Sequence, residues 1–272
     1  MRYFLHFLVF ALTTIITQVG GVFYLIGVIL YTLFRVEKTI IKFLITVMVY
    51  LVGIVIILPP MAKMNNRVAM PVFKVKETHV GCHTLFTVLT NRHYVRPELK
   101  QLVLDAAIDV NQKYPGVKVE YLDGSFPLFK EWRMLPHLKH DDGTKLDVSF
   151  IRSKSKSGKY SNRYFSFFGY GFSEPPKSTE EDYPAKCEAL GKWQYNIIEK
   201  IVPDQHWRKL SFPIAENSFL VESIINQPNC RYVFIEPHLK TRLGFSNNSR
   251  VRFHGCWAVR HDDHMHIQIN RK

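Results

Sequence analysis

Two long apolar runs open the 272-residue chain and separate it into unlike parts. The first contains 32 residues without an Asp, Glu, Lys or Arg and begins after Arg2, and the second contains 20 and begins at Phe43. A helix needs about 20 such residues to cross the hydrocarbon core of a bilayer. The pattern therefore predicts transmembrane helices at about 8–34 and 43–58, which would make residues 1–59 a two-helix membrane hairpin.

A cleaved signal peptide is the alternative for the first run, but its apolar stretch exceeds the roughly 7–15 residues of a signal-peptide core. The second helix is expected to end at Pro59-Pro60. Basic loops tend to stay in the cytoplasm, yet charge alone leaves the orientation close to a tie. The residues involved are Arg35, Lys38 and Lys42 against Glu37 between the helices, and Lys63, Arg67, Lys74 and Lys76 after them.

The remaining sequence mixes helical and strand periods. We expect a linker at 60–79 and a folded domain at 80–272. Apolar residues recur at helical spacing from Pro97 to Tyr114, and proline suits the first turn of a helix. Further expected elements are strands at 117–122, 146–150 and 231–236, a helix at 185–201, and segments 251–253 and 256–259 leading into a final strand.

Two histidine-rich stretches carry the candidate chemistry. In a strand alternate side chains share a face, so His264 and His266 would point to the same side. His140 and Asp147 lie seven residues apart, and a turn at Asp142-Gly143 could bring them together. Zinc binds imidazole nitrogen and carboxylate oxygen, and a catalytic zinc has three protein ligands and an open position. His140, Asp147 and His266 would form such a set.

These residues resemble a family of zinc peptidases that contains lysostaphin, D-alanyl-D-alanine peptidases and the hedgehog signalling domain, marked by H-x6-D followed downstream by H-x-H. The likeness is closest to the penicillin-insensitive murein endopeptidases, with H-x-x-H before the acidic ligand, a following glycine, and H-D-D-H-x-H near the end. The matching residues are His137, His140, Gly143, Asp147 and His261-Asp262-Asp263-His264-Met265-His266. Lys139 departs from the pattern, which usually has a small hydroxyl residue there.

The resemblance implies Zn²⁺ on His140, Asp147 and His266, with further histidines around the reacting centre. It also implies the α+β fold of that group, with a small antiparallel sheet flanked by helices, and a helix beginning at Pro237. Zinc lowers the pKa of a bound water to about 7 and polarises a carbonyl.

A proton acceptor and donor is still needed for catalysis. His264 is the first candidate because it shares a strand face with His266, and Asp263 is the second. His137 and His261 could bind the developing oxyanion or orient the water. A carboxylate behind a ligand histidine fixes its tautomer, and Asp142 or Asp262 could have this role.

The resemblance therefore indicates a metallopeptidase acting on cross-links or stem peptides of peptidoglycan. The protein would be a multi-pass protein of the cell (inner) membrane with a periplasmic catalytic domain. A non-catalytic zinc-containing binding module displayed on the membrane is the rival from another class, and a metallopeptidase acting on another peptide is a third hypothesis.

Three further features of the sequence remain. The formal charge of +13 would attract the protein to anionic lipid or an anionic cell wall. Nucleic acid is the usual alternative for such a charge, but the sequence contains no recognised nucleic-acid-binding motif. Among four cysteines, Cys230–Cys256 is the preferred disulfide, with Cys82 and Cys187 as the others and free buried thiols as the alternative. Tyr164 or Tyr170 could stack on a sugar, although packing is the safer interpretation.

Overall fold

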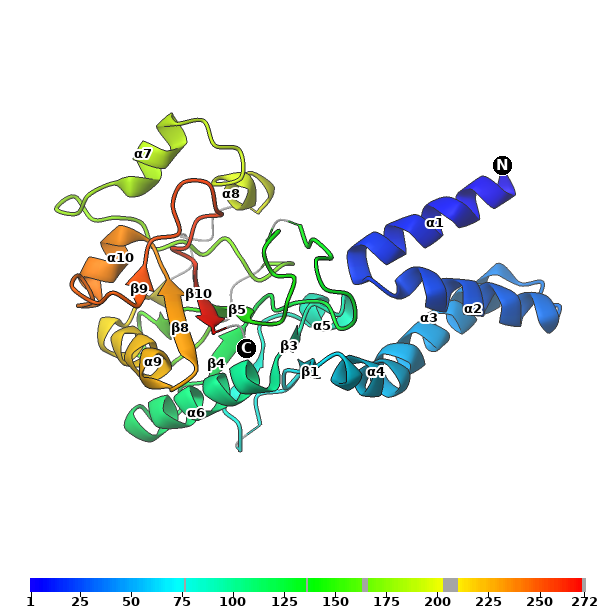
Figure 1. Cartoon of the computed structure of the whole chain (residues 1–272), viewed down its shortest axis with the longest axis horizontal. Helices are drawn as coiled ribbons and strands as arrows, with labels where there is room; N and C mark the ends of the chain where they lie inside the picture. Colours follow the sequence, from blue (N-terminus) through cyan, green and yellow to red (C-terminus); the bar gives the residue numbers. More distant parts are fainter. Residues whose placement is uncertain (76, 136, 163–165, 203–209, 271–272) are drawn as a thin grey trace.

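A computed structural model describes residues 1–75, 77–135, 137–162, 166–202 and 210–270 (Figure 1). It contains an α+β domain with a mixed sheet flanked by helices, preceded by apolar helices that project from one side. We call these helices, residues 2–64, the helical arm. The α+β class expected from the sequence is confirmed.

The central sheet has six strands in the order β2-β4-β5-β10-β8-β9. Their bounds are β2 Val80–Cys82, β4 Val119–Tyr121, β5 Lys145–Ser149, β8 Cys230–Phe234, β9 Val251–Arg252 and β10 His264–Ile269. The pairs β2–β4 and β8–β9 are parallel and the others antiparallel, so the sheet is mixed and not purely antiparallel as expected. Parallel neighbours need a crossover connection, and helices lie between the strands of both parallel pairs.

Two helices, α6 (Pro97–Lys113) and α9 (Ile214–Asn226), contribute to the main core with the sheet (Figure 1). Alternate residues of the central strands, such as Val148 and Ile267, are fully buried in this core. The helix predicted at 97–114 is confirmed, whereas α9 was not predicted. The polar residues that alternate with this core lie on the opposite face of the sheet.

Shorter elements complete the domain. They are α5 Leu85–Leu89, α7 Tyr183–Ala189, α8 Ile197–Ile201, α10 Pro237–Arg242, and the strand pairs β1 (Val68–Ala69) with β3 (Tyr94–Val95) and β6 (Ser153–Lys154) with β7 (Leu210–Ser211). The single helix predicted at 185–201 is wrong, because Gly191 has φ of +64° and separates α7 from α8. The helix expected at Pro237 is present, and segment 256–259 is not a strand.

The arm contains α1 (Arg2–Thr17), α2 (Gly20–Leu33) and a long helix from α3 (Thr39–Val52) through the π-turn Gly53–Ile57 to α4 (Leu58–Met64). Among the described residues, this long helix of 26 residues, Thr39–Met64, is the one long and apolar enough to cross a membrane.

Two predictions for the arm are therefore wrong. The run 8–34 is broken at Gln18, whose φ is 69°, so a single helix over this run is not present and the expected two-helix hairpin is not confirmed. The second helix does not end at Pro59-Pro60. Those prolines occupy the first turn of α4, just after the π-turn, where their missing N–H groups cost little.

Part of the predicted linker at 60–79 is packed against the domain. Arg67 is buried, and its guanidinium donates to Ser125 Oγ and to the carbonyls of Phe126 and Asp141. The helical arm is thus joined to the domain by structured chain.

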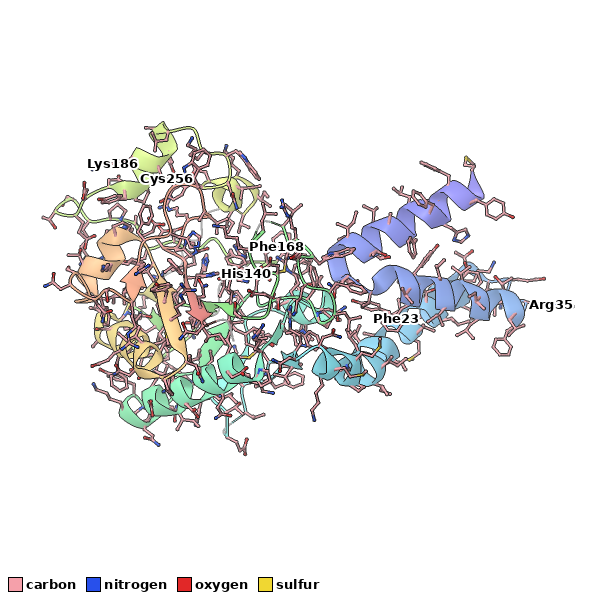
Figure 2. All side chains as sticks on the ribbon, viewed as in Figure 1. Phe23, Arg35, His140, Phe168, Lys186 and Cys256 are labelled. Carbon is pink, nitrogen blue, oxygen red and sulfur yellow. A yellow bond between two sulfur atoms is a disulfide. The ribbon has the colours of Figure 1, made fainter. Side chains whose placement is uncertain are left out.

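All four cysteines lie among the described residues, and the disulfide joins Cys187 to Cys256 (Figure 2). The predicted Cys230–Cys256 pair is wrong, because Cys230 opens β8, pairs with Ile269 and is buried in the core. Cys82 and Cys230 are buried thiols.

Candidate metal centre

Adjacent central strands bring the two histidine-rich stretches together. In the β5–β10 register His266 lies opposite Asp147, and His264 lies opposite Ser149. The core residues Leu146 and Met265 point to the helices, so the side chains of Asp147, His264 and His266 share the other face. The expected strand geometry of His264 and His266 is confirmed.

The predicted ligand set converges at one point. His266 Nδ1 lies 2.8 Å from Asp147 Oδ1 and 3.0 Å from His140 Nε2, and the latter lies 3.3 Å from Asp147 Oδ1. Tetrahedral zinc with bonds of about 2.0–2.1 Å separates its ligand atoms by about 3.3 Å. The three atoms therefore form a slightly contracted face of such a tetrahedron, and the donor set fits a zinc ion.

A local turn carries His140 to this point. Gly143 has φ of +75°, a conformation that glycine adopts without strain, and the chain then enters β5. The turn expected at Asp142-Gly143 is confirmed. His140 Nδ1 lies 2.8 Å from the carbonyl of Gly124, which requires Nδ1 to donate and leaves the Nε2 lone pair for a metal.

The charge states also suit a metal. Burial lowers the pKa of His266 to about 3, so its imidazole is neutral at pH 7. Burial raises the pKa of the Asp147 carboxyl, but His140, His137 and His264 outweigh it and hold this pKa well below its usual range. A neutral imidazole and an ionised carboxylate are the forms that bind metal.

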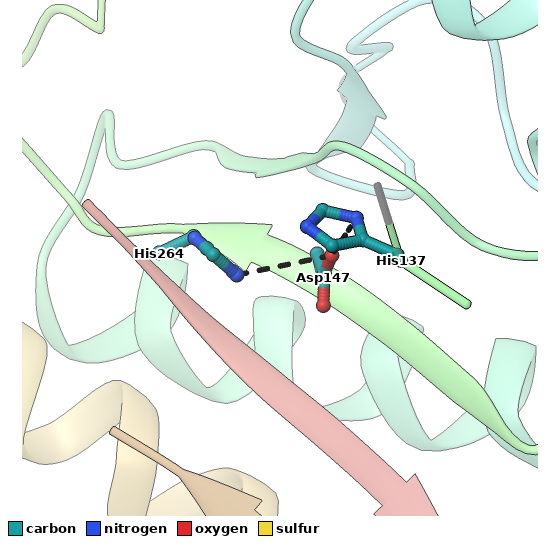
Figure 3. Close-up of side chains that lie close together, drawn as sticks. All are labelled: His137, Asp147 and His264. Atoms are coloured by element: carbon teal, nitrogen blue, oxygen red, sulfur yellow. Dashed lines mark ion pairs between the residues drawn. The ribbon is translucent and has the colours of Figure 1, made fainter. Parts of the chain in front are cut away.

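The second oxygen of Asp147 faces two other histidines (Figure 3). His137 Nδ1 lies 3.0 Å from Asp147 Oδ2, and His264 Nε2 lies 3.8 Å from it. These groups could also hold a cation, but His137 Nδ1 already faces Asp123 Oδ2 at 3.2 Å. The tighter set at Oδ1 is therefore the better metal site.

His264 is held by the neighbouring carboxylate of Asp263 through a short contact at Nδ1. Burial lowers the pKa of His264, but the charges of Asp263 and Asp147 outweigh burial and raise it to about 9. At neutral pH His264 is protonated, and its buried Nε2 has no hydrogen-bond partner among the described residues. An imidazolium is thus placed beside the metal ligands with one N–H free.

His261 completes the histidine cluster. Its ring centroid lies 4.8 Å from that of His264, and burial lowers its pKa well below the usual range. A cavity of about 40 Å³ leads to this cluster and includes His137, Lys139, Gln194, His254, Trp257 and His261 in its lining. All seven predicted site residues are buried around this centre: His137, His140, Asp147, His261, Asp263, His264 and His266.

Sequence reasoning missed the residues that support the centre. Tyr170 OH lies 2.9 Å from Asp147 Oδ2 and 3.0 Å from Asp123 Oδ2, and Arg92 Nη2 donates to Asp123 at 2.7 Å. Tyr170 was expected to pack in the domain or to stack on a sugar. No local motif links these three residues to the metal ligands.

The structure gives the two predicted orienting carboxylates other partners. Asp142 Oδ1 accepts from Thr144 in the turn, and Asp262 Oδ2 accepts from Arg260. Tyr164, the other predicted stacking residue, lies outside the described residues.

Comparison with known proteins adds no relative, since the chain matches no model of a known protein family and no curated protein. The interpretation of this centre therefore depends on its geometry and on the motifs themselves.

Proposed function

We propose that this protein is a membrane-anchored zinc peptidase that cleaves peptide bonds of peptidoglycan, either cross-links or stem peptides. The observation that supports the reaction type most directly is the convergence of His140 Nε2, Asp147 Oδ1 and His266 Nδ1 within 3.3 Å of one another. The choice of peptidoglycan rests on the motif resemblance.

Zinc held by His140, Asp147 and His266 would supply a polarising charge and an acidified water. Protein groups then handle protons and position the substrate. His264 carries a proton at Nε2 and is suited to donate it to the leaving amine, and Asp263 stabilises this imidazolium before the proton is transferred. His137 Nδ1 faces the carboxylates of Asp123 and Asp147, and burial lowers the pKa of this imidazole, so the proton lies on Nδ1. His137 Nε2 is buried without a partner among the described residues, and as an acceptor it could orient the attacking water.

The arm supports a membrane location and favours one orientation. The start of α1 and Arg35 both lie at the end of the arm away from the domain (Figures 1 and 2). Basic residues at this end are Arg2, Arg35, Lys38 and Lys42, against Glu37.

At the domain end the basic residues are largely engaged. Arg67 is buried and hydrogen-bonded, and Lys74 pairs with Glu120. Lys63, in the last turn of α4, is exposed. By the positive-inside rule, this difference supports a cytoplasmic far end and a periplasmic domain.

The test uses the full chain in detergent with purified cross-linked peptidoglycan, and fragments are identified by mass spectrometry. We expect cross-linked dimers or stem peptides to be shortened, and we expect this activity to be lost with a chelator and in His140→Ala. The matched variant His264→Gln should lose turnover but keep bound zinc, measured by elemental analysis.

Other outcomes separate the hypotheses. Tight zinc binding without any released fragment would indicate the non-catalytic binding module, and cleavage of unrelated peptides alone would indicate another substrate. Loss of zinc in His264→Gln equal to that in His140→Ala would contradict the role given to His264.

A further inference from the structure

Several exposed apolar side chains lie on segments of the domain that contact one another. Arg92 lies over the ring of Phe86 in α5 and donates to the carbonyl of Leu135, and Phe86 packs against Phe167. Leu135 is 64 % exposed and Phe129 is 58 % exposed, although both belong to the large apolar class that usually packs inside. They lie on the loop before the metal-binding stretch, and their neighbours come from α5 and from the segment after residue 165. We call this set the apolar face: Leu85, Leu89, Phe129, Leu135 and Phe167.

The apolar face adjoins the helical arm. Gln18, at the break between α1 and α2, bonds through its side chain to the backbone of Leu128 and Phe129. Tyr50 OH, on α3, donates to the carbonyl of Leu89 at 2.5 Å. The arm thus leaves the domain beside these exposed residues, while α7, α9 and α10 lie on the other side of the domain (Figure 1).

The length of the long helix places this junction at bilayer depth. Between Thr39 and Tyr50 the helix extends only about 18 Å, at about 1.5 Å per residue. A bilayer core is about 30 Å thick. A crossing that uses Thr39–Met64 must therefore continue past Tyr50, and lipid then reaches the part of the domain that contacts Tyr50.

Charged side chains border the same loop. Lys130, Glu131 and Arg133 are exposed between Phe129 and Leu135, so the loop carries a net positive charge of one. Basic residues beside an apolar surface attract anionic headgroups at close range. The ring centroids of Trp132 and Phe129 lie 6.4 Å apart. Tryptophan is enriched at membrane–water interfaces.

We propose that the apolar face is a bilayer-contacting surface, which seats the domain against the membrane with Leu89, Phe129 and Leu135 in contact with lipid. This inference rests on the membrane anchorage in the proposed function, but not on peptidase activity. Leu135 also lines an apolar cavity of about 240 Å³ whose wall includes Tyr170. Tyr170 also contacts the candidate ligand Asp147, so this cavity lies between the apolar face and the candidate metal centre.

Spin labels on single cysteines in the full chain test this surface. Labels at Phe129→Cys and Leu135→Cys report the face, Met48→Cys reports the arm, and Ile214→Cys at the start of α9 is the exposed control on another side of the domain. Each variant is reconstituted in vesicles containing anionic phosphatidylglycerol. Accessibility to oxygen, which concentrates in lipid, is compared with accessibility to a water-soluble nickel chelate. The unsubstituted chain measures labelling of the two native thiols, which are buried.

We expect the ratio of oxygen to nickel accessibility at residues 129 and 135 to exceed the ratio at residue 214 at least threefold. Equal ratios at 129, 135 and 214, with a lipid-exposed label at 48, would overturn the bilayer-contacting surface and leave anchorage intact. A water-exposed label at residue 48 would overturn both. Zinc content of each variant confirms that the domain is folded.

Discussion

Removal of one buried hydroxyl group, in Tyr170→Phe, tests how the candidate metal ligand Asp147 is held. Burial, together with Asp123 and Asp147, raises the pKa of Tyr170 well above its usual range, so the phenol stays protonated and donates. Its oxygen lies 2.9 Å from Asp147 Oδ2. Because this bond occupies one carboxylate oxygen, the other oxygen is kept in position for the metal.

The size of the effect follows from these contacts. A hydrogen bond to a charged group contributes about 1.5–3 kcal/mol to stability, and the variant also leaves buried carboxylates short of a donor. Partners behind a metal ligand typically change metal affinity 10–100-fold, which is about 1.4–2.7 kcal/mol. We expect Tyr170→Phe to weaken zinc binding by that factor and to unfold at lower denaturant concentration.

The assay is zinc competition against a chromophoric chelator, with urea unfolding measured on the same samples. Tyr195→Phe is the matched control, since Tyr195 is also buried and its hydroxyl donates to a carboxylate, Glu236 Oε2, at 3.0 Å. Glu236 is not in the ligand set. Both variants should lose stability, but only Tyr170→Phe should lose zinc affinity. Wild-type zinc affinity in Tyr170→Phe, or equal loss in the two variants, would refute the reasoning.

Two further predictions concern stability. Burial and the charge of Asp262 raise the pKa of Glu236 from 4.5 to about 7, so the native state binds an extra proton between these values and wild-type stability falls as the pH rises. The free energy of unfolding of Glu236→Gln, measured by urea titration, should therefore increase by roughly 3 kcal/mol relative to that of the wild type between pH 4 and pH 8. A pH-independent difference would contradict this. Replacing Cys187 and Cys256 together by Ser opens a loop with a sequence separation of 69, which should lower the free energy of unfolding by about 4 kcal/mol. Reductant should lower the Tm of the wild type but not that of the double variant. A wild-type Tm that does not respond to reductant would contradict the disulfide.

The sequence was most informative where a pattern is local. The alternation around His264 and His266 predicts their shared face, and the Asp142-Gly143 turn predicts the approach of His140 to Asp147, because both depend on a few consecutive residues.

Features that depend on distant partners were not predictable in the same way. The break at Gln18 is held by backbone groups 110 and 111 residues away, so the run 8–34 looks continuous in sequence. The disulfide depends on a fold that sends Cys230 into the core. Tyr170 supports Asp147 from a loop with no periodic pattern of its own.

The position of β10 in the middle of the sheet has a consequence for biosynthesis. The strands β5 and β8, on either side of it, do not pair with each other, and β10 supplies His266, 119 residues after Asp147. At about 5–20 residues per second, the ribosome needs roughly 6–24 s to add this length. During that interval the emerging chain has neither a joined sheet nor a complete metal site. The sheet can therefore close, and the candidate metal site can be completed, only after the chain through β10 has been made.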